Sequence, residues 1–393
     1  MNAGRTLVIR ALAGIARIPV AVMAERLTGP WEPTKEDFKR LVANPYTRTT
    51  EARKHHGGKP YAAAHGSYPF FLSSPLDREL SALGPTGDWQ IEWKWDGIRA
   101  QLIHRNSSVL LWSRGAEALS VHFSEILEAG KKLEDGTVLD GEIVAWQGAG
   151  PLSFSRLQTR LTRSQNFSRE NIPIAFIAYD ILESDGRDIR NKDLRSRREQ
   201  LEQTIGRINS VSQSEPVVRL SPVLPAEDWN EVAAWKEKAR SHRAEGLMIK
   251  KLDSFYGAGR KSGYWWKWKV DPYFIDAVLL DARRGRGRWS GAYTDYMMGV
   301  WDQGKLVSIG KAYCGLNDAE IREVNNVISR NTAQRSGPAA VPALVLELAF
   351  ENIQPSQQHK SGISVRSLRI HRWRRDKKPE EADTLASLRA LMV

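Results

Sequence analysis

The chain has 393 residues and a formal net charge of +12 at neutral pH. This length allows two or three domains, and the positive charge favours an anionic partner such as nucleic acid, with a merely basic soluble enzyme as the alternative. The single cysteine, Cys314, excludes a disulfide framework and a zinc site built from several thiolates, so a reducing compartment is expected. No apolar run approaches the roughly 18 residues of a membrane span, so no membrane partner is expected.

Residues 1–66 are predicted to form short helices followed by a polar tether. Five apolar residues recur there at helical spacing: Val8, Leu12, Ile15, Ile18 and Val22. Pro19 is expected to kink this helix or to begin a second one. Arginines with no acid before Glu25 would also fit an organelle transit peptide, but the periodicity favours a packed helix.

The second block, residues 67–271, alternates strand-like and helical runs. A strand is expected at residues 89–95 and, after a break at Gly97, its partner strand at residues 98–103. Further buried strands are expected at residues 138–146, 174–181 and 246–251. A helix is predicted at residues 121–133, and a solvated helix rich in Arg, Glu and Gln at residues 194–208.

The third block, residues 272–393, is dominated by alternating runs at residues 296–300, 306–309 and 343–350. Short strands broken by Gly and Asn predict a small barrel. No internal repeat of 20–50 residues is visible, which argues against a solenoid.

The first motif that could carry out chemistry is Lys94-Trp95-Asp96-Gly97-Ile98-Arg99. Strand alternation places Glu92, Lys94 and Asp96 on one face and the intervening tryptophans on the other. A lysine attacks only as the neutral amine, and cationic neighbours or partial burial favour that form, so a phosphorus centre can be its target. Considered alone, this stretch fits a half-exposed strand with ordinary outward charges equally well.

Acidic and aromatic side chains follow on other strands. Glu142, in Leu-Asp-Gly-Glu, enters an otherwise apolar strand, where a carboxylate is costly unless it meets a cation, a metal or a hydroxyl. It could therefore hold a ribose hydroxyl or a divalent ion, whereas Asp140 also fits a simple Asp-Gly turn. Tyr179, at the end of an apolar strand, could stack on a base, although such an aromatic is usually part of a core.

Two further strands carry charged candidates. Glu245 and Lys250 have opposite strand parity and share a face only if a bulge intervenes, so Glu245 is the preferred site residue. Lys267 and Lys269 lie on one face of a strand whose other face carries tryptophans. Paired ammonium groups repel unless a polyphosphate neutralises them, and they lower the pKa of a lysine nearby. A solvated strand with alternating lysines explains the tryptophans poorly.

Two basic groups lie in the third block. The run at residues 366–377 contains Asp376 between Arg375 and Lys377, which suggests a pyrophosphate clamp braced by its own carboxylate rather than a plain basic surface. The second group, separated by glycines, is expected to form a loop that binds DNA phosphates: Arg283, Arg284, Arg286 and Arg288.

Six motifs, in their order along the chain, resemble those of a bacterial ATP-dependent DNA ligase of the ligase B type, a covalent nucleotidyltransferase. They are the motifs that contain Lys94, Glu142, Tyr179, Glu245, the pair Lys267 and Lys269, and Asp376. The resemblance implies an α+β protein, with an adenylation (nucleotidyltransferase) domain of antiparallel sheets and helices at residues 67–271 and an all-β OB-fold domain at residues 272–393. It also implies that residues 1–66 are the shortened end of a helical DNA-binding domain plus a linker. An NAD-dependent ligase is disfavoured because its four-cysteine zinc module cannot be built from Cys314 alone.

The resemblance further implies roles for individual residues in binding the nucleotide. Lys94 matches the lysine that becomes adenylylated, and Glu92 matches the position that reads the adenine amino group. Tyr179 matches the aromatic stacked on adenine. Arg99 and Arg114 match arginines that contact the ribose and the nicked strand or its phosphate.

Other matched positions concern the phosphates and the metal. Glu142, in Leu-Asp-Gly-Glu, and Glu245 match two acids that are associated with Mg²⁺ or Mn²⁺. Lys267 and Lys269 match the pair that grips the α-phosphate of ATP. The motif that orients pyrophosphate for departure is matched by three residues: Arg374, Asp376 and Lys377.

The expected activity is the sealing of nicks in duplex DNA, through lysyl-AMP, transfer of AMP to the 5′-phosphate and attack by the 3′-hydroxyl. The OB-fold domain is expected to swing about Asp271-Pro272. A monomer in the bacterial cytoplasm, associated with the nucleoid and with DNA-repair proteins, is expected. The alternatives are an RNA ligase, an mRNA-capping guanylyltransferase and a non-catalytic DNA-end-binding module, the last disfavoured by the intact motif residues.

Overall fold

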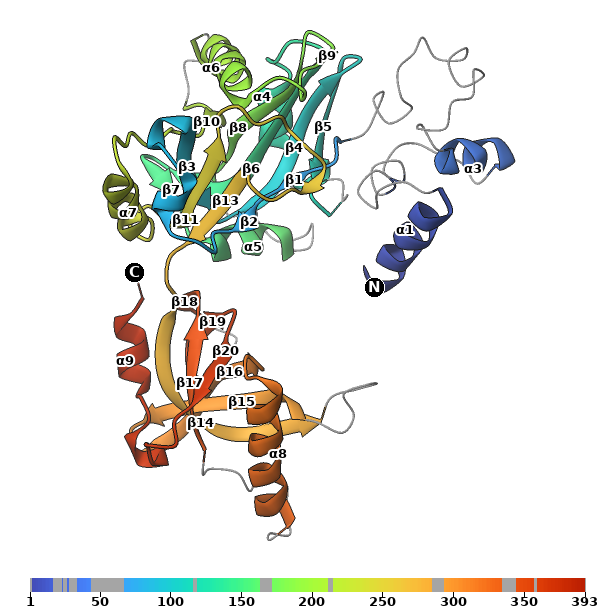
Figure 1. The fold of residues 1–393 in the computed structure, drawn as a ribbon. Coiled ribbons are helices and arrows are strands. Elements are labelled where there is room, and N and C mark those ends of the chain that lie inside the picture. Colours follow the sequence, from blue (N-terminus) through green and yellow to red (C-terminus); the bar gives the residue numbers. More distant parts are fainter. Residues whose placement is uncertain are drawn as a thin grey trace. The chain divides into compact units, whose positions relative to one another are not determined.

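The computed structural model describes residues 2–16, 23, 27, 34–43, 67–115, 119–162, 172–210, 215–284, 293–333, 344–356 and 359–392. The chain forms two compact units, Met1–Val270 and Asp271–Val393 (Figure 1). Among the described helices, none is both long enough and apolar enough to cross a membrane.

The N-terminal segment contains two described helices, α1 (Asn2–Ala16) and α3 (Lys35–Val42). They share a small apolar cluster, made of Ile9, Ala13, Ala16, Met23 and Leu41. The expected helix is present, but its buried face differs from the prediction, because Val8 and Ile15 are 53% and 66% exposed. Thr34 caps α3 by accepting a hydrogen bond from the backbone N–H of Asp37. Ile18, Pro19 and Val22 lie outside the described residues.

The larger sheet of the first unit has a central path in the order β10-β8-β6-β4-β5. Its strands are β4 (Ile98–Arg105), β5 (Ser108–Ser113), β6 (Thr137–Gln147), β8 (Ile174–Ser184) and β10 (Val218–Leu220), with β7 (Gly150–Pro151) beside β6 and β9 (Arg187–Asp188) beside β8. Neighbours on the path are antiparallel except β10 and β8. Successive residues of β8, such as Phe176 and Ile177, enter different core clusters, so this strand is buried on both faces.

Helices contribute to the core on one face of this sheet. They are η4 (Ser120–His122), α4 (Ser124–Gly130), α5 (Phe154–Thr162) and α6 (Leu194–Ser210). Phe123, Ile126 and Leu201 pack there with the sheet residue Phe176. The helix predicted to be solvated corresponds to α6, and that description is wrong for its inner side, where Arg197 is fully buried.

A smaller sheet in the order β2-β13-β11-β3 packs beside the larger one. Its strands are β2 (Ser74–Pro75), β3 (Trp89–Trp95), β11 (Ala244–Lys251) and β13 (Trp265–Lys269). The remaining elements of the unit are η2 (Leu80–Leu83), η3 (Thr86–Asp88), α7 (Trp229–Lys238) and the paired strands β1 (Phe71–Leu72) and β12 (Gly259–Arg260). The two sheets share a core cluster that includes Trp95, Val144 and Ile177.

The strand of the first motif and the strand after it belong to different sheets. The prediction that they pair is wrong, because β3 pairs with β11 whereas β4 pairs with β5 and β6. Gly97 lies at this crossing, directly against β6. A Cβ atom at Gly97 would stand 2.2 Å from the carbonyl oxygen of Ile143 and 2.9 Å from Cγ of Glu142. Only glycine fits this approach without a shift of the backbone.

A β-bulge interrupts the pairing of β11 with β3 between Ala244 and Leu247. Gly246 occupies the bulge with a φ of +138°, and a Cβ atom there would stand 2.2 Å from the carbonyl oxygen of Trp268. The extra residue changes the strand parity on either side of the bulge. Glu245 and Lys250, which an uninterrupted strand would separate, can therefore serve the same side of the sheet.

The second unit is a closed five-stranded barrel in the order β14-β15-β16-β20-β17. The barrel strands are β14 (Tyr273–Arg284), β15 (Tyr293–Asp302), β16 (Lys305–Tyr313), β17 (Val345–Phe350) and β20 (Arg369–Trp373). The other elements are α8 (Asp318–Ala333), the hairpin of β18 (Asn352–Pro355) and β19 (Ile363–Arg366), η6 (Pro379–Glu381) and α9 (Leu385–Ala390). This is the predicted OB-fold architecture. The unpredicted helix α8 contributes Val324 and Ile328 to the barrel core.

Candidate active site

Lys94 lies near the end of β3 with 22% of its side chain exposed, and its amine forms an ion pair with Glu245 of β11. The same Oε2 atom of Glu245 lies 3.6 Å from Nζ of Lys269 on β13. On the other face of β3, Trp93 packs on Trp235 and on the stacked ring of His242, as strand alternation predicted. The structure thus brings Lys94, Glu245 and Lys269 together from three adjacent strands.

Lys267, also on β13, adds a further positive charge to this cluster. Partial burial, followed by the nearby charges of Lys94, Lys269 and Arg260, lowers the pKa of Lys267 below its usual range. Clustered ammonium groups of this kind attract a polyanion such as a nucleotide phosphate chain. The predicted grouping of Lys94, Lys267 and Lys269 is present.

Glu142 of β6 also interacts with this cluster. Burial raises the pKa of Glu142 to about 8, with Asp140 and Glu245 adding to the effect and Lys94 and Arg99 opposing it. Without a bound cation, this carboxyl therefore stays largely protonated at neutral pH. A cation bound beside it would favour the ionised form.

The acids around Lys94 fit a divalent ion whose coordination is completed by substrate. Glu142 and Glu245 are close enough for their charges to interact with each other and with Lys94. Within the described ranges, no group of three or more His, Cys, Asp or Glu side chains is positioned to hold a metal ion by itself. Mg²⁺ is commonly bound by one or two carboxylates together with phosphate oxygens and water, which matches this donor set.

Arg99 of β4 is held by an acid and two aromatic rings. Its guanidinium donates hydrogen bonds of 3.2 and 2.7 Å to the two oxygens of Asp140, which is fully buried. The guanidinium carbon lies 5.1 Å from the ring centre of Phe70 and 5.8 Å from that of Tyr179. The Tyr256 hydroxyl donates to Asp140 at 2.7 Å, and burial together with Asp140 raises the pKa of Tyr256 well above its usual range. Arg99 is therefore fixed in orientation before any ligand binds.

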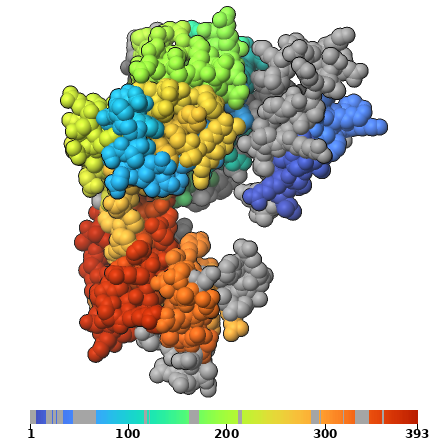
Figure 2. Space-filling view, in the orientation of Figure 1, coloured from blue at the N-terminus to red at the C-terminus, as the bar shows by residue number. Residues whose placement is uncertain are grey.

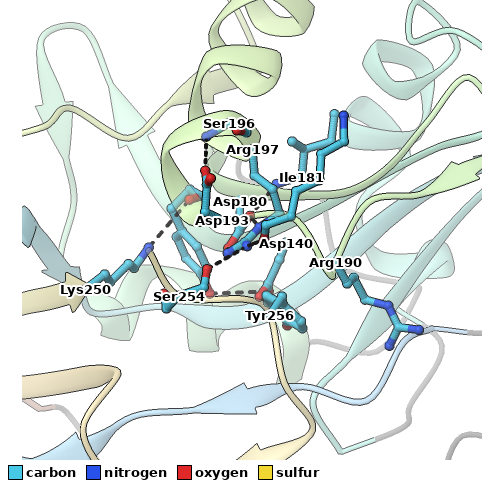
Figure 3. Close-up of polar contacts among 12 residues, drawn as sticks. Asp140, Asp180, Ile181, Arg190, Asp193, Ser196, Arg197, Lys250, Ser254 and Tyr256 are labelled. Atoms are coloured by element: carbon cyan, nitrogen blue, oxygen red, sulfur yellow. Dashed lines mark hydrogen bonds and ion pairs between the residues drawn. The ribbon is translucent and has the colours of Figure 1, made fainter. Parts of the chain in front are cut away.

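A buried ion pair between Arg197 and Asp180 supports the segment that carries Tyr256 (Figure 3). Arg197 of α6 donates to both oxygens of Asp180 at 2.8 and 3.0 Å, and to the backbone carbonyl of Ser254 at 3.0 Å. Both side chains of the pair are fully buried. Ser254 stands two residues before Tyr256, in the segment that follows β11. In Figure 2, the gold surface adjoins the light-green surface from earlier in the first unit. A chain of contacts thus runs from α6 to the carboxylate that holds Arg99.

Glu92 occupies a separate buried position on β3. Its carboxylate accepts a hydrogen bond of 2.9 Å from Nζ of Lys250, and each side chain is only 1% exposed. Gln90 also donates to it. Lys250 lies 4.5 Å from the ring centre of Tyr179 and 4.7 Å from that of Trp265, so this cation is enclosed by an acid and two aromatic faces. The ring of Tyr179 accordingly lies near both Arg99 and Lys250 and is only half-buried.

The described residues among those predicted to contact DNA lie at the surface. Arg114 follows β5, is exposed, and its backbone N–H donates to the carbonyl of Arg99 at 3.1 Å. Arg283 and Arg284 are exposed at the end of β14. Arg286 and Arg288 lie outside the described residues.

The motif predicted to act on pyrophosphate lies in the second unit. Nη1 of Arg374 and Nζ of Lys377 approach the same oxygen of Asp276, on β14, at 2.7 and 2.6 Å. Arg374 also donates to Asp376 at 2.7 Å through Nη2. This hydrogen bond to Arg374 lowers the pKa of Asp376 to about 2. The predicted brace between Arg374 and Asp376 is present.

Some contacts of these sites were not foreseen from the sequence. From the sequence, Lys250 is a weaker candidate site residue than Glu245, because its place in the site depends on the bulge at Gly246. Asp140 and Asp276 were not identified as partners of arginines. Each is an acid inside an apolar strand, and this signal could have identified both, since a buried carboxylate requires a cation or donors.

Family models agree with this geometry. Residues 73–269 match the model of the ATP dependent DNA ligase domain, and residues 289–377 match that of the ATP dependent DNA ligase C terminal region. The chain belongs to the ATP-dependent DNA ligase family. Members of this family use ATP and a divalent metal ion.

Curated relatives share much of this chain but are longer. A probable DNA ligase of Opitutus terrae is 34% identical over 330 residues, which cover 77% of this chain and 32% of that protein. A probable DNA ligase of Koribacter versatilis is 32% identical over 338 residues, covering 80% of this chain and 58% of that protein. The chain thus spans between a third and six-tenths of the length of these relatives.

A solved structure of a Lig E DNA ligase has the same fold. It superposes with a TM-score of 0.53 at 18% sequence identity and covers 77% of this chain and 99% of that chain. At this level of identity, the likeness concerns the fold, an adenylation unit followed by an OB-fold barrel.

Proposed function

We propose that this chain is an ATP-dependent DNA ligase that seals nicks in duplex DNA through a lysyl-AMP intermediate. The observation that carries the proposal is the contact of the Lys94 amine with Glu245, inside a cluster that also contains Lys267, Lys269 and Glu142. A nucleophilic amine next to a carboxylate and to further ammonium groups suits attack on the α-phosphorus of a nucleoside triphosphate.

In the first step, Nζ of Lys94 loses a proton and attacks the α-phosphorus of ATP. A nitrogen–phosphorus bond forms while the bond to pyrophosphate breaks, and the electron pair of that bond leaves with pyrophosphate. Glu245 is in contact with the amine and is the residue best placed to receive its proton. Lys267 and Lys269 stabilise the negative charge that builds on the α-phosphate. A divalent ion held by Glu142 and Glu245 supplies additional charge stabilisation when bound.

The adenosine is assigned to the region beyond Lys94, toward Glu92 and Tyr179. The buried Glu92 carboxylate is an acceptor suited to an exocyclic amine, and the half-buried ring of Tyr179 offers a face for a base. Arg99, held in place by Asp140, is assigned to the ribose and to the phosphate of the nicked strand. Arg114, exposed and hydrogen-bonded through its backbone to Arg99, is assigned to the same strand.

In the later steps, a 5′-phosphate oxygen of the nick attacks the phosphorus of lysyl-AMP, and Lys94 departs with the electron pair of its bond. The 3′-hydroxyl then attacks the 5′-phosphorus and releases AMP, which closes the strand. Arg374 and Lys377 are assigned to pyrophosphate in the first step, and the basic group that begins with Arg283 and Arg284 to the DNA backbone.

The proposal extends to organisation and setting. Residues 1–66 are assigned to helical DNA-binding sequence with a linker, residues 67–271 to the adenylation domain and residues 272–393 to the OB-fold domain. The partner is nicked duplex DNA, with DNA-repair proteins as further partners. A monomer acting in the cytoplasm on nucleoid DNA fits the strongly basic composition.

Covalent labelling tests the central claim. Incubation with Mg²⁺ and ATP labelled at the α-phosphate should transfer the label to the protein through an acid-labile, base-stable bond. Lys94→Ala should remove the label. Lys251→Ala should keep it, because Lys251 lies on the same strand as Glu245 but pairs with Asp253. Unlabelled parent protein, or undiminished label on Lys94→Ala, would overturn the proposal.

Substrate arms of the same experiment separate the other enzyme classes. Labelling by GTP in preference to ATP would indicate a guanylyltransferase, and sealing of nicked RNA but not of nicked DNA would indicate an RNA ligase. Binding to nicked DNA without any label or sealing would indicate a non-catalytic DNA-end-binding module.

A further inference from the structure

Asp276 is an acidic residue on the wall of the OB-fold barrel. It lies on β14 between the buried residues Ile275 and Ala277, and its side chain is 7% exposed. Its Cα partner on the neighbouring strand β17 is another acid, Glu347. Two adjacent carboxylates at this depth are costly unless cations satisfy them.

The two cations that meet Asp276 come from the turn after β20. Arg374 and Lys377 both direct a nitrogen at Oδ2 of Asp276, at 2.7 and 2.6 Å. Within the described part of the chain, Asp276 is the only carboxylate at ion-pair distance from Lys377. Oδ1 of Asp276 is buried and has no hydrogen-bond partner among the described residues, so Oδ2 alone connects the two side chains.

The backbone of Asp276 is anchored by two hydrogen bonds with Asp383. The backbone N–H of Asp276 donates to Oδ2 of Asp383 at 2.7 Å, and the N–H of Asp383 donates to the carbonyl of Asp276 at 2.8 Å. Arg374 and Lys377 are 17% and 30% exposed, respectively, and lie beyond the end of β20. A fixed acid thus holds two more exposed cations at a set spacing.

We propose that Asp276 is a positioning residue for the first step, which holds Arg374 and Lys377 at the spacing that receives the departing pyrophosphate. This inference rests on the proposed function, in which these two cations act on that group. Arg374 also pairs with Asp376 and Glu347. Among the described residues, Lys377 pairs with Asp276 alone and is 30% exposed, so Lys377 keeps attraction for a polyphosphate. The shared oxygen also restricts the conformations of the two side chains before the ligand binds. Less conformational entropy is therefore lost when pyrophosphate is bound.

The proposal predicts a division between reaction steps. Arg374 and Lys377 act when pyrophosphate leaves, and sealing of a nick that already carries AMP on its 5′-phosphate does not require that event. Asp276→Asn keeps the shape of the side chain but removes its charge. It should slow the labelling of Lys94 by ATP roughly 10- to 100-fold, the range typical of a misplaced binding group. Sealing of a pre-adenylylated nick should remain as in the parent protein.

The full-length chain allows matched controls. Asp295→Asn removes an ion pair on another strand of the same barrel, with Lys311, and should leave both steps unchanged. Asp276→Glu keeps the charge and should recover part of the labelling rate lost in Asp276→Asn. In a double-mutant cycle, the effects of Asp276→Asn and Lys377→Met should be less than additive, because both changes remove the contact of Lys377 with Asp276, while the contact with Arg374 is weakened only in Asp276→Asn.

The outcomes separate this inference from the proposed function. Unchanged or faster labelling of Asp276→Asn, or an equal loss in labelling and in sealing of the pre-adenylylated nick, would overturn the role of Asp276. If Asp276→Asn does not fold, the comparison of Asp276→Glu with Lys377→Met decides, and additive effects would overturn the role. Failure of the parent protein to take label from ATP would instead refute the proposed function.

Discussion

In each of the two units, one carboxylate joins two cations, yet the two arrangements differ in what surrounds them. Glu245 contacts Lys94 and Lys269 across three strands of an open sheet, with Lys267 and Glu142 close by. Asp276 joins Arg374 and Lys377 from the wall of a closed barrel. Both clusters contain groups with shifted pKa values, but the shifts differ in direction. Near Glu245 the pKa of Glu142 is raised and that of Lys267 is lowered, which favours their neutral forms, whereas near Asp276 the hydrogen bond to Arg374 lowers the pKa of Asp376 and favours its ionised form. At Asp276, the arrangement favours positioning over proton transfer.

The largest expected effect concerns the acid in contact with the nucleophile. Glu245→Gln removes the carboxylate that pairs with Lys94 and Lys269, so we expect the rate of Lys94 labelling to fall about 10²- to 10³-fold, as for other deletions of a transition-state contact. Single-turnover labelling measures this. Glu128→Gln, an exposed acid on α4, serves as the control. If Glu245→Gln slowed labelling less than Asp276→Asn does, Glu245 would not be the more important of the two carboxylates for this step.

The buried pair of Lys250 and Glu92, apart from the role proposed for Glu92 in binding adenine, should contribute to stability. Lys250→Met leaves Glu92 without its cation in a site that excludes water, and we expect the free energy of unfolding to fall by about 3–5 kcal/mol. Denaturant unfolding monitored by tryptophan fluorescence measures this loss. Combining Lys250→Met with Glu92→Gln should restore part of the stability. A double variant less stable than Lys250→Met would contradict the assignment.

The pH dependence of the metal-free protein should report on Glu142. Its pKa is raised from an ordinary value of 4.5 to about 8, so between these values the folded chain holds a proton that the unfolded chain has released. The stability provided by the neutral carboxyl is complete below pH 4.5 and is lost as the pH rises through about 8. Melting curves with a chelator should therefore show lower stability at pH 9 than at pH 6. Glu142→Gln should flatten this dependence, and an unchanged slope would disprove the assignment.

The smallest effect is expected for an exposed ion pair. Asp295→Asn breaks the contact with Lys311, in which the two side chains are 37% and 46% exposed, respectively. Such pairs contribute about 0–1 kcal/mol, so the melting temperature should hardly change. If Asp295→Asn lost as much stability as Lys250→Met, burial would not determine how much these ion pairs contribute to stability.

Local patterns in the sequence predicted much of this arrangement. Alternation along residues 89–95 placed Lys94 and Trp93 on opposite faces, and the structure confirms this because both are set by a single strand. The barrel also followed from short alternating runs. Motif resemblance contributed the choice of Lys94, Glu142 and Tyr179, which an isolated strand would not have distinguished from ordinary surface or core residues.

Features that depend on contacts between distant segments were not predicted. The transfer of the chain to another sheet at Gly97 depends on its approach to Ile143, which no local pattern reveals. The partners of Asp140 and Asp276 come from other strands or turns, about 40 and 100 residues away in the chain. The position of Lys250 depends on a single bulge, which shifts strand parity.

The crossing at Gly97 has a mechanical consequence. Lys94 and Arg99 are five residues apart, but the strands that carry them hydrogen-bond to different neighbours. A nucleotide that engages both side chains therefore adds a bridge between two sheets that otherwise meet through the core cluster of Trp95, Val144 and Ile177. If ATP binds as proposed, its binding should accordingly stiffen the first unit as a whole.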